Sequence, residues 1–266
     1  MINLVSAMAL PISVFSDGRK VDSGTGFIYF FEEKAWLITN WHLFTGRDST
    51  SPERPKYPTP THISVIASRL EDKDTLSFQE FTLPLNIGGR SAWIQHAYGP
   101  PYDIAAIPFR WNVDYTPHFR KMGSFLGYSM VGDIDWGVSS ECFVLGFPQV
   151  RGNRHNLPIW KRATVASEPD LDYASQPMFL VDTLTSGGMS GSPVVLFRSG
   201  SYTSRGGALN AIAGAKGPAK SVQLIGVYSG RYLEDDPLAP QLGKVWRIST
   251  VDEMLSNPSP GFLPGN

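Results

Sequence analysis

Short apolar runs separated by turn residues dominate the hydrophobic pattern of this chain. Each run is rich in β-branched or aromatic residues and is bounded by Gly, Pro, Ser, Asp or Asn, which is the pattern of β-strands. The runs cover residues 23–30, 35–40, 62–68, 103–109, 141–147, 178–184, 192–197, 223–229 and 244–249. Helical periodicity is scarce. We therefore predict an all-β protein built as barrels or a sandwich, not from βαβ units.

Segments outside these runs complete the expected layout. Residues 1–15 are apolar and broken by Pro11, and they predict a first strand. Residues 249–255 begin with Ser-Thr, place acidic residues in a first turn and precede Pro258, which predicts a short helix. Segments 46–60 and 198–221 are expected to be loops, the second long enough to be mobile or functional. A less structured region near 111–130 divides the chain into two β-rich halves.

Composition and charge narrow the function classes. The chain has 266 residues, 42% of them hydrophobic, and a formal net charge of -1, so we expect no nucleic-acid or membrane partner. Its single cysteine, Cys142, excludes an intramolecular disulfide and lies in an apolar run, where we expect a buried thiol. No Cys or His pair has metal-ligand spacing, so we expect no metal and no cofactor.

The first residues of the sequence do not have the pattern of a secretion signal peptide. No Lys or Arg precedes Arg19, and the apolar start is short. No run approaches the roughly 18 apolar residues of a membrane helix. We expect a cytoplasmic protein, with secretion after removal of a leader as the alternative.

The stretch TSGGMSGSPVV, residues 185–195, contains the candidate nucleophile Ser190. A glycine-rich surface turn is the alternative interpretation. A serine hydroxyl is a weak nucleophile, so it needs a base that a third group orients. Among the five histidines, His42 is the best candidate because it follows the apolar run 35–39 through Asn40 and Trp41, and a strand end is a rigid place from which to aim an imidazole.

Asp103 is the best candidate for the orienting carboxylate. It precedes the apolar run 104–107, and an aspartate at the mouth of a buried strand needs a partner. A turn residue after Gly99 is the alternative reading. Asp182 is the main rival, but it lies only eight residues before Ser190 and is better placed to support that loop.

The glycines around Ser190 fit acyl-transfer chemistry. Backbone N–H groups stabilise the negative charge that develops on a carbonyl oxygen, and glycine permits the sharp turn that presents them. We expect the N–H groups of Gly188 and Ser190 to be the oxyanion donors. The order His42, Asp103, Ser190 differs from that of α/β-hydrolases and matches the chymotrypsin-like double β-barrel.

On these residues the sequence resembles the trypsin-like (chymotrypsin-fold) serine peptidases, most of all the bacterial glutamyl endopeptidases and then the HtrA-type proteases. The matching segments include GTGFIYF, WLITNWH, YDIAAIPF and DTLTSGGMSGSPVV. The resemblance implies one peptidase domain over residues 1–266. It would have an N-terminal barrel at about 1–115, a C-terminal barrel at about 125–250 and a helix with a tail at 250–266. Both barrels would be six-stranded, with His42, Asp103 and Ser190 in the cleft between them.

The resemblance also implies a substrate-binding site. Leu184 and Thr185 would form the base and wall of the pocket for the residue before the scissile bond. Tyr228, Ser229 and Gly230 would lie on the strand that pairs with the substrate, and Ser229 would contact Asp103. Glutamyl endopeptidases have His where this chain has Tyr228, which argues against their acidic preference, and an apolar floor at Leu184 predicts a small or apolar residue. Met189 replaces the Asp that digestive enzymes use for activation by a new N-terminus.

Two functions from different classes follow. The first is a serine endopeptidase that cleaves peptide or protein substrates through an acyl-enzyme on Ser190. The alternative is a catalytically silent or conditionally suppressed binding module with the protease fold. Either form is compatible with a regulatory partner or subunit bound through loop 198–221.

Overall fold

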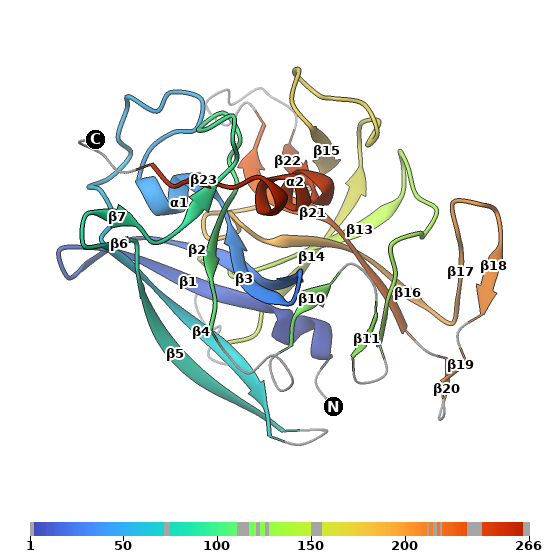
Figure 1. The fold of residues 1–266 in the computed structure, drawn as a ribbon. Helices are drawn as coiled ribbons and strands as arrows, with labels where there is room; N and C mark the ends of the chain where they lie inside the picture. The colour runs from blue at the N-terminus through green and yellow to red at the C-terminus, as the bar shows by residue number, and fades with distance from the viewer. Residues whose placement is uncertain are drawn as a thin grey trace.

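The computed structural model describes residues 3–71, 75–110, 117–120, 123–125, 128–149, 156–211, 213–214, 217–218, 220–232 and 241–262. Within these ranges the protein consists of β-strands, a short 3-10 helix η1 (Leu4–Met8) and two α-helices, α1 (Trp41–Thr45) and α2 (Ile248–Ser256). The all-β class predicted from the hydrophobic pattern is therefore confirmed. Figure 1 shows two large sheets whose strands come from the two halves of the chain.

The N-terminal sheet has the strand order β23-β8-β9-β3-β2-β1-β4-β5, and β10 pairs in parallel with β2. The β1–β2 hairpin turns through Asp17 and Gly18, whose φ angles of 47° and 75° suit a two-residue turn. Alternate residues of β1 (Leu10, Ile12 and Val14) pack into the core of this sheet. The strands are β1 (Ala9–Ser16), β2 (Arg19–Phe31), β3 (Lys34–Thr39), β4 (His62–Leu70), β5 (Leu76–Pro84), β8 (Ile94–Gln95), β9 (Ala105–Pro108), β10 (Phe119–Arg120) and β23 (Ser259–Pro260).

The C-terminal sheet closes into a six-stranded barrel in the order β21-β16-β13-β14-β15-β22, because β22 also pairs with β21. Two further strands, β11 and β12, extend it beyond β21. The strands are β11 (Gly123–Phe125), β12 (Tyr128–Met130), β13 (Glu141–Gly146), β14 (Ile159–Val165), β15 (Met178–Asp182), β16 (Pro193–Ser199), β21 (Lys220–Arg231) and β22 (Leu242–Arg247). In the described part of the N-terminal sheet no pairing joins β5 to β8 or β23 at the other edge, so closure into a ring is observed for the C-terminal sheet alone.

The barrel core agrees with the sequence. Cys142 is fully buried among Val144, Val194 and Val245, and burial raises the pKa of its thiol to about 12. The prediction of a core thiol is confirmed. A second apolar cluster, which includes Phe27, Leu145 and Trp246, draws on both sheets. The described helices include none that is long and apolar enough to cross a membrane.

Every predicted strand has a counterpart, but several boundaries differ. Residues 4–8 form a 3-10 turn, and the first strand starts at Ala9 with Pro11 inside it. The predicted strand at 103–109 shortens to β9, so Asp103 lies before it. The alternating strand β5 was not predicted.

The predicted C-terminal helix exists but begins earlier than expected. It starts at Ile248 with Arg247 at the N-cap, where no side chain caps the backbone. Its first turn contains no acidic residue, so the capping pattern predicted for 249–255 is wrong. The Arg247 side chain instead donates to the carbonyl of Pro169 and pairs with Asp172. These residues outside the helix therefore fix where it starts.

Segment 198–221 contains more regular structure than a loop. It begins within β16, ends within β21 and carries the hairpin β17 (Ser201–Thr203) and β18 (Leu209–Ala211), followed by the short pair β19 (Ala213–Gly214) and β20 (Gly217–Pro218). The β17–β18 hairpin projects from the edge of the molecule in Figure 1. A further two-stranded ribbon, β6 (Asn86–Ile87) and β7 (Arg90–Ser91), lies in the N-terminal half.

Candidate active site

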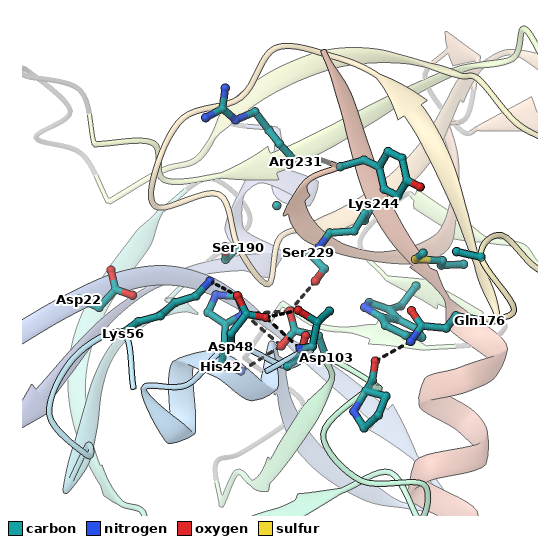
Figure 2. A pocket seen from close by; sticks show the side chains of 18 residues that line it. Asp22, His42, Asp48, Lys56, Asp103, Gln176, Ser190, Ser229, Arg231 and Lys244 are labelled. Carbon is teal, nitrogen blue, oxygen red and sulfur yellow. Dashed lines mark hydrogen bonds and ion pairs between the residues drawn. The ribbon is translucent and has the colours of Figure 1, made fainter. Parts of the chain in front are cut away.

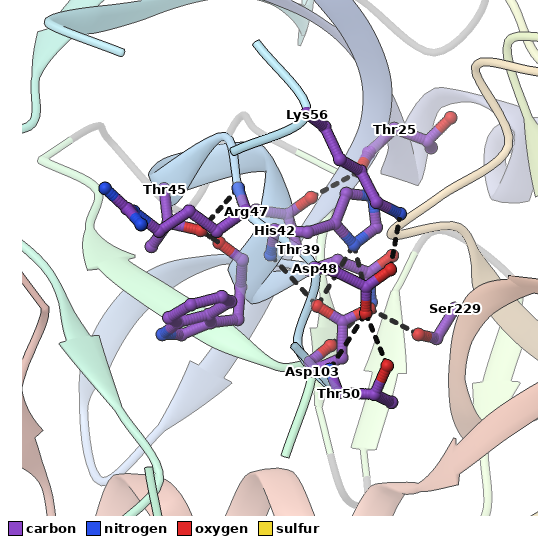
Figure 3. A network of polar contacts seen from close by, with 12 residues as sticks. Thr25, Thr39, His42, Thr45, Arg47, Asp48, Thr50, Lys56, Asp103 and Ser229 are labelled. Atoms are coloured by element: carbon purple, nitrogen blue, oxygen red, sulfur yellow. Dashed lines mark hydrogen bonds and ion pairs between the residues drawn. The ribbon is translucent and has the colours of Figure 1, made fainter. Parts of the chain in front are cut away.

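His42 and Asp103 form a tight pair between α1 and the segment before β9. His42 Nδ1 lies 2.8 Å from Asp103 Oδ2 and 3.0 Å from Oδ1, and the backbone N–H of His42 donates to Oδ1 at 2.9 Å. Figure 3 shows both interactions converging on the carboxylate. His42 lies in the short helix α1, one turn beyond the end of β3, not at the strand end itself. Asp103 therefore fixes both the ring and the backbone of His42.

Asp103 is only 4% exposed, yet its surroundings favour the ionised form. Burial alone would raise the pKa of this carboxyl group, but the His42 imidazole and the hydrogen bonds from His42 and Ser229 lower it below its ordinary value. The Ser229 hydroxyl donates to Oδ2, as expected from the sequence. The rival carboxylate, Asp182, lies exposed at the end of β15, and the carboxylate that binds His42 is that of Asp103.

Ser190 lies in a tight turn between β15 and β16. Gly188 and Gly191 have φ angles of 93° and 83°, in the left-handed region that favours glycine. A Cβ on Gly188 would run into the carbonyl oxygen of Phe147, and one on Gly191 into that of Thr25. Both glycines are therefore required by the backbone path and by close packing.

In this turn the carbonyl groups of Gly188 and Ser190 are hydrogen-bonded, whereas their N–H groups have no acceptor among the described residues. The carbonyl of Gly188 accepts from Thr25 Oγ1 at 2.8 Å, and the carbonyl of Ser190 accepts from the Thr25 N–H at 2.8 Å. Within the described ranges, no hydrogen-bond acceptor is found for the N–H of Gly188 or of Ser190. These are the two donors that the sequence suggested for an oxyanion.

His42, Asp103 and Ser190 line one cavity of about 620 Å³. Ser229, Gly230, Arg231 and Lys244 form its wall on the C-terminal barrel, as Figure 2 shows. Among the described residues no hydrogen bond joins Ser190 Oγ to His42, although such bonds are often loose before a substrate binds. The cavity thus brings together all three residues that the sequence singled out.

The segment 46–60 forms the wall of the cavity beside His42. Lys56 Nζ lies 3.2 Å from Asp48 Oδ2, and Thr50 donates to Asp48 Oδ1 from both its hydroxyl and its N–H. Burial opposes ionisation of Asp48, but the Thr50 hydrogen bonds and Lys56 lower its pKa to about 2. The Tyr57 hydroxyl donates to the carbonyl of His42 at 3.0 Å. The segment predicted as a loop therefore holds α1 in place, and the charges of Asp48 and Lys56 within it neutralise each other.

Of the five residues expected around the scissile bond, Ser229 and Gly230 line the cavity, whereas Leu184, Thr185 and Tyr228 do not. Leu184 is 60% exposed and does not line the cavity, so the expected apolar floor at Leu184 does not appear in the structure. The Tyr228 ring is buried instead, packs close to Gly243, and its hydroxyl contacts Thr185 Oγ1. Ser229 and Gly230 do line the cavity. The Tyr228 ring thus belongs to the buried core of the C-terminal barrel and does not line the cavity.

Three residues of the site escaped the sequence reasoning. Thr25 on β2 supports the Ser190 turn from the other sheet, and Phe147 N donates to its hydroxyl at 3.1 Å. Asn40 donates to the carbonyl of Asp103 at 2.7 Å, and Tyr57 supports α1. Thr25 and Asn40 lie in GTGFIYF and WLITNWH, two segments on which the resemblance rests. Nothing in the neighbouring sequence indicates which residues they would bind.

The described residues contain no group of three His, Cys, Asp or Glu side chains placed to hold a metal ion. The basic residues Arg151, Arg154 and His155 lie outside the described ranges.

Comparison with known proteins gives structural but not sequence matches. No family model matches the chain, and no curated protein matches it. The serine endoprotease from Yersinia pestis is similar in structure, with a TM-score of 0.50 and 10% identity. The match covers 96% of this chain and 66% of the Yersinia chain, so this chain spans slightly less than two thirds of that protein.

Two further solved structures lie near the same level. The protease Anisep from Arthrobacter nicotinovorans gives a TM-score of 0.49 at 13% identity, covering 91% of this chain and 90% of its own. The active form of the Rv3671c protease from M. tuberculosis gives 0.48 at 16% identity, covering 99% and 86%. The all-β architecture, the closed six-stranded barrel and the match to the Yersinia enzyme together show that this chain has the chymotrypsin-like fold of serine proteases.

Proposed function

We propose that this protein is a serine endopeptidase that cleaves extended peptide segments through an acyl-enzyme on Ser190. The observation that carries the proposal is the buried His42–Asp103 pair in the same cavity as Ser190. The two open N–H groups of Gly188 and Ser190 support it, because an oxyanion needs donors that are not already used.

The proposed reaction has two halves. In the first, Ser190 Oγ attacks the substrate carbonyl while His42 Nε2 takes the hydroxyl proton, and Asp103 holds the ring with Nδ1–H toward the carboxylate. The N–H groups of Gly188 and Ser190 donate to the carbonyl oxygen as it becomes negative. His42 then gives the proton to the amine, the C–N bond breaks, and the acyl group stays on Ser190.

In the second half, water replaces the amine. His42 takes a proton from the water as its oxygen attacks the ester, and the same two N–H groups hold the oxyanion. The C–Oγ bond breaks, Ser190 regains its proton from His42, and the carboxylic acid leaves. No metal or cofactor takes part in this proposal.

We propose a small residue immediately before the scissile bond. The proposal rests on the buried Tyr228 ring and its contact with Thr185, which would leave little room for a long side chain at this position. The bacterial glutamyl endopeptidase and HtrA-type branches remain our proposal for the nearest relatives. An acidic preference at this position is not proposed, because Tyr228 replaces the histidine that the resemblance associates with it.

The competing candidate is a silent or conditionally suppressed binding module. One observation favours it: Ser190 Oγ and His42 are not hydrogen-bonded in the described structure. Both proposed functions use the same cavity, so only a measurement of peptide cleavage distinguishes the endopeptidase from the binding module.

The test is cleavage of a peptide library made from a digested proteome, read by mass spectrometry as new peptide ends. We expect the wild type to produce new ends at defined sites, and Ser190→Ala to be slower by roughly 10³-fold or more. Equal cleavage by Ser190→Ala would overturn the proposed role of Ser190. A wild type that produces no new ends would favour the binding module.

A further inference from the structure

Lys244 lies on the wall of the active-site cavity, and none of the described residues forms an ion pair with it. It lies in the middle of β22, where Val245 packs into the barrel interior while Lys244 and Trp246 line the cavity. Within the described ranges no carboxylate lies within ion-pair distance of its ammonium group. Lys56, in the same cavity, differs because it is paired with Asp48 at 3.2 Å.

Two of the described carboxylates that line the cavity already have partners. Asp48 is balanced by Lys56, and Asp103 is bound by His42 and Ser229. Arg231 is a second basic residue on the same wall, next to Gly230, whereas Asp22 lies on the opposite wall (Figure 2). Of the described residues at this end, a negatively charged group would therefore meet the Lys244 ammonium group and no uncompensated carboxylate.

Space for a side chain exists at the same place. The pairing of β21 with β22 is irregular between Tyr228 and Arg231, so Ser229 and Gly230 are not part of the regular ladder. A Cβ built on Gly230 would meet no atom within 4 Å. The described residues therefore leave space for a side chain beside Gly230.

We propose that Lys244 determines specificity by binding an acidic side chain of the substrate, two or four residues before the scissile bond. The inference rests on the proposed function. A substrate that adds as a strand along 229–231 turns alternate side chains toward the cavity, because side chains alternate along a strand. Trp246 and the stem of Lys244 supply an apolar wall, and the ammonium group binds the carboxylate at its end.

A positional series of fluorogenic peptides tests this assignment. The peptides share one sequence cleaved by the protein and differ only by Glu, Gln or Lys at each of the four positions before the scissile bond. At position two or four, we expect kcat/KM for Glu to exceed that for Gln by roughly tenfold at low salt, and the ratio to fall as salt is added. Lys244→Met should bring the Glu-to-Gln ratio to about one, and Lys244→Glu should favour the Lys peptide.

The matched control is Lys34→Met, which removes an exposed lysine on β3 and should keep the wild-type ratio. Labelling of Ser190 by a peptide-free fluorophosphonate reports for each variant whether the active site is folded. Binding of the same Glu and Gln peptides to Ser190→Ala, followed by fluorescence anisotropy, measures the preference without turnover.

These readouts separate the two proposals. Suppose that the protein is labelled and cleaves peptides, but shows no preference for Glu at positions two and four, or keeps that preference in Lys244→Met. Either result would overturn the role of Lys244 and leave the endopeptidase proposal intact. Suppose instead that the protein is neither labelled nor cleaves peptides, but binds the Glu peptide more tightly than the Gln peptide in a way that depends on Lys244. This result would overturn the endopeptidase proposal and support the Lys244 site for acidic side chains. Equal binding of the Glu and Gln peptides would also overturn the role of Lys244.

Discussion

Gly187 and Gly188 are neighbours in the turn before Ser190, but they meet different constraints. Gly188 has a φ of 93°, and a Cβ there would run into the carbonyl oxygen of Phe147. A Cβ on Gly187 would make only ordinary contacts with Gln149, the nearest at 3.5 Å. The backbone at Gly188 thus depends on the absence of a side chain, whereas that at Gly187 does not.

This difference predicts opposite results for two alanine variants. Gly188→Ala should rotate the peptide that carries its N–H away from the oxyanion position and lower kcat/KM by roughly 10²–10³-fold, the cost of one lost donor. Gly187→Ala should stay within a few-fold of wild type, as kinetic assay of both variants on one peptide will show. Equal activities would mean that the Gly188 N–H is not an oxyanion donor.

The sequence identified His42, Asp103 and Ser190 because each has a local signal: a strand end, a strand mouth and a glycine-rich turn. It did not identify Thr25 or Tyr57, because their roles arise from contacts across the fold. Thr25 and Gly188 are 163 residues apart in the chain. The exposed position of Leu184 was missed as well, because nothing in the local sequence shows which side of the turn faces solvent.

At the scale of elements, β2 carries the support for the nucleophile turn. The Thr25 hydroxyl donates to the carbonyl of Gly188 and accepts from Phe147 N, and it is fully buried between the two sheets. Its N–H donates to the carbonyl of Ser190. The two halves of the chain therefore meet at the site through hydrogen bonds as well as through apolar packing.

Thr25→Val keeps the shape of the side chain and removes the hydroxyl. It should leave the Gly188 carbonyl and the Phe147 N–H unpaired, cost roughly 1–3 kcal/mol of unfolding free energy, and lower kcat. Thr25→Ser, which keeps the hydroxyl, is the matched control and should retain most of kcat. Urea unfolding and steady-state kinetics measure both effects, and a Val variant as stable and active as Ser would contradict this role.

His96 joins the end of β8 to helix α2. It is buried, stacks on Tyr102 with 4.1 Å between ring centroids, and its Nε2 lies 3.5 Å from Glu253 Oε1. Its Nδ1 accepts from the Tyr98 N–H at 3.3 Å, which requires the neutral form at that nitrogen. Burial lowers the pKa of His96, and the nearby Glu253 offsets this only in part.

This burial predicts a loss of stability in mild acid. The pKa of His96 is lower in the folded than in the unfolded state, so the unfolded state binds the proton first and stability falls as pH drops below about 6.5. His96→Gln should lose less unfolding free energy than wild type between pH 7.5 and pH 5.5 in urea titrations. His62→Gln measures the contribution of a partly exposed histidine, and a wild-type slope in His96→Gln would refute the assignment.

Element boundaries were the weakest part of the sequence prediction, for identifiable reasons. The start of α2 is set by Arg247, whose partners Pro169 and Asp172 are distant in sequence. The β17–β18 hairpin was predicted as loop because its Ser, Thr and Gly residues show no alternating apolar pattern. A partner bound through segment 198–221 stays a proposal, now directed at a hairpin.

At the scale of the whole molecule, two all-β halves meet along an apolar cluster and enclose one cavity that holds the three candidate catalytic residues. The class of the fold followed from the hydrophobic pattern, since short strands with turn residues leave few other architectures. Closure of a ring could be observed only in the structure, where β22 pairs with β21. Likewise, only the structure shows that Lys244 on β22 shares the cavity with segment 229–231 and has no ion-pair partner among the described residues.

The central claim is that Ser190 is a nucleophile activated by His42 and Asp103. Its most direct test is labelling with a fluorophosphonate probe, followed by mass spectrometry to locate the modified residue. We predict a single phosphonate adduct on Ser190 that disappears in Ser190→Ala and forms much more slowly in His42→Ala. Absence of an adduct on Ser190 in the folded wild type, or an adduct on another residue that persists in Ser190→Ala, would contradict the claim.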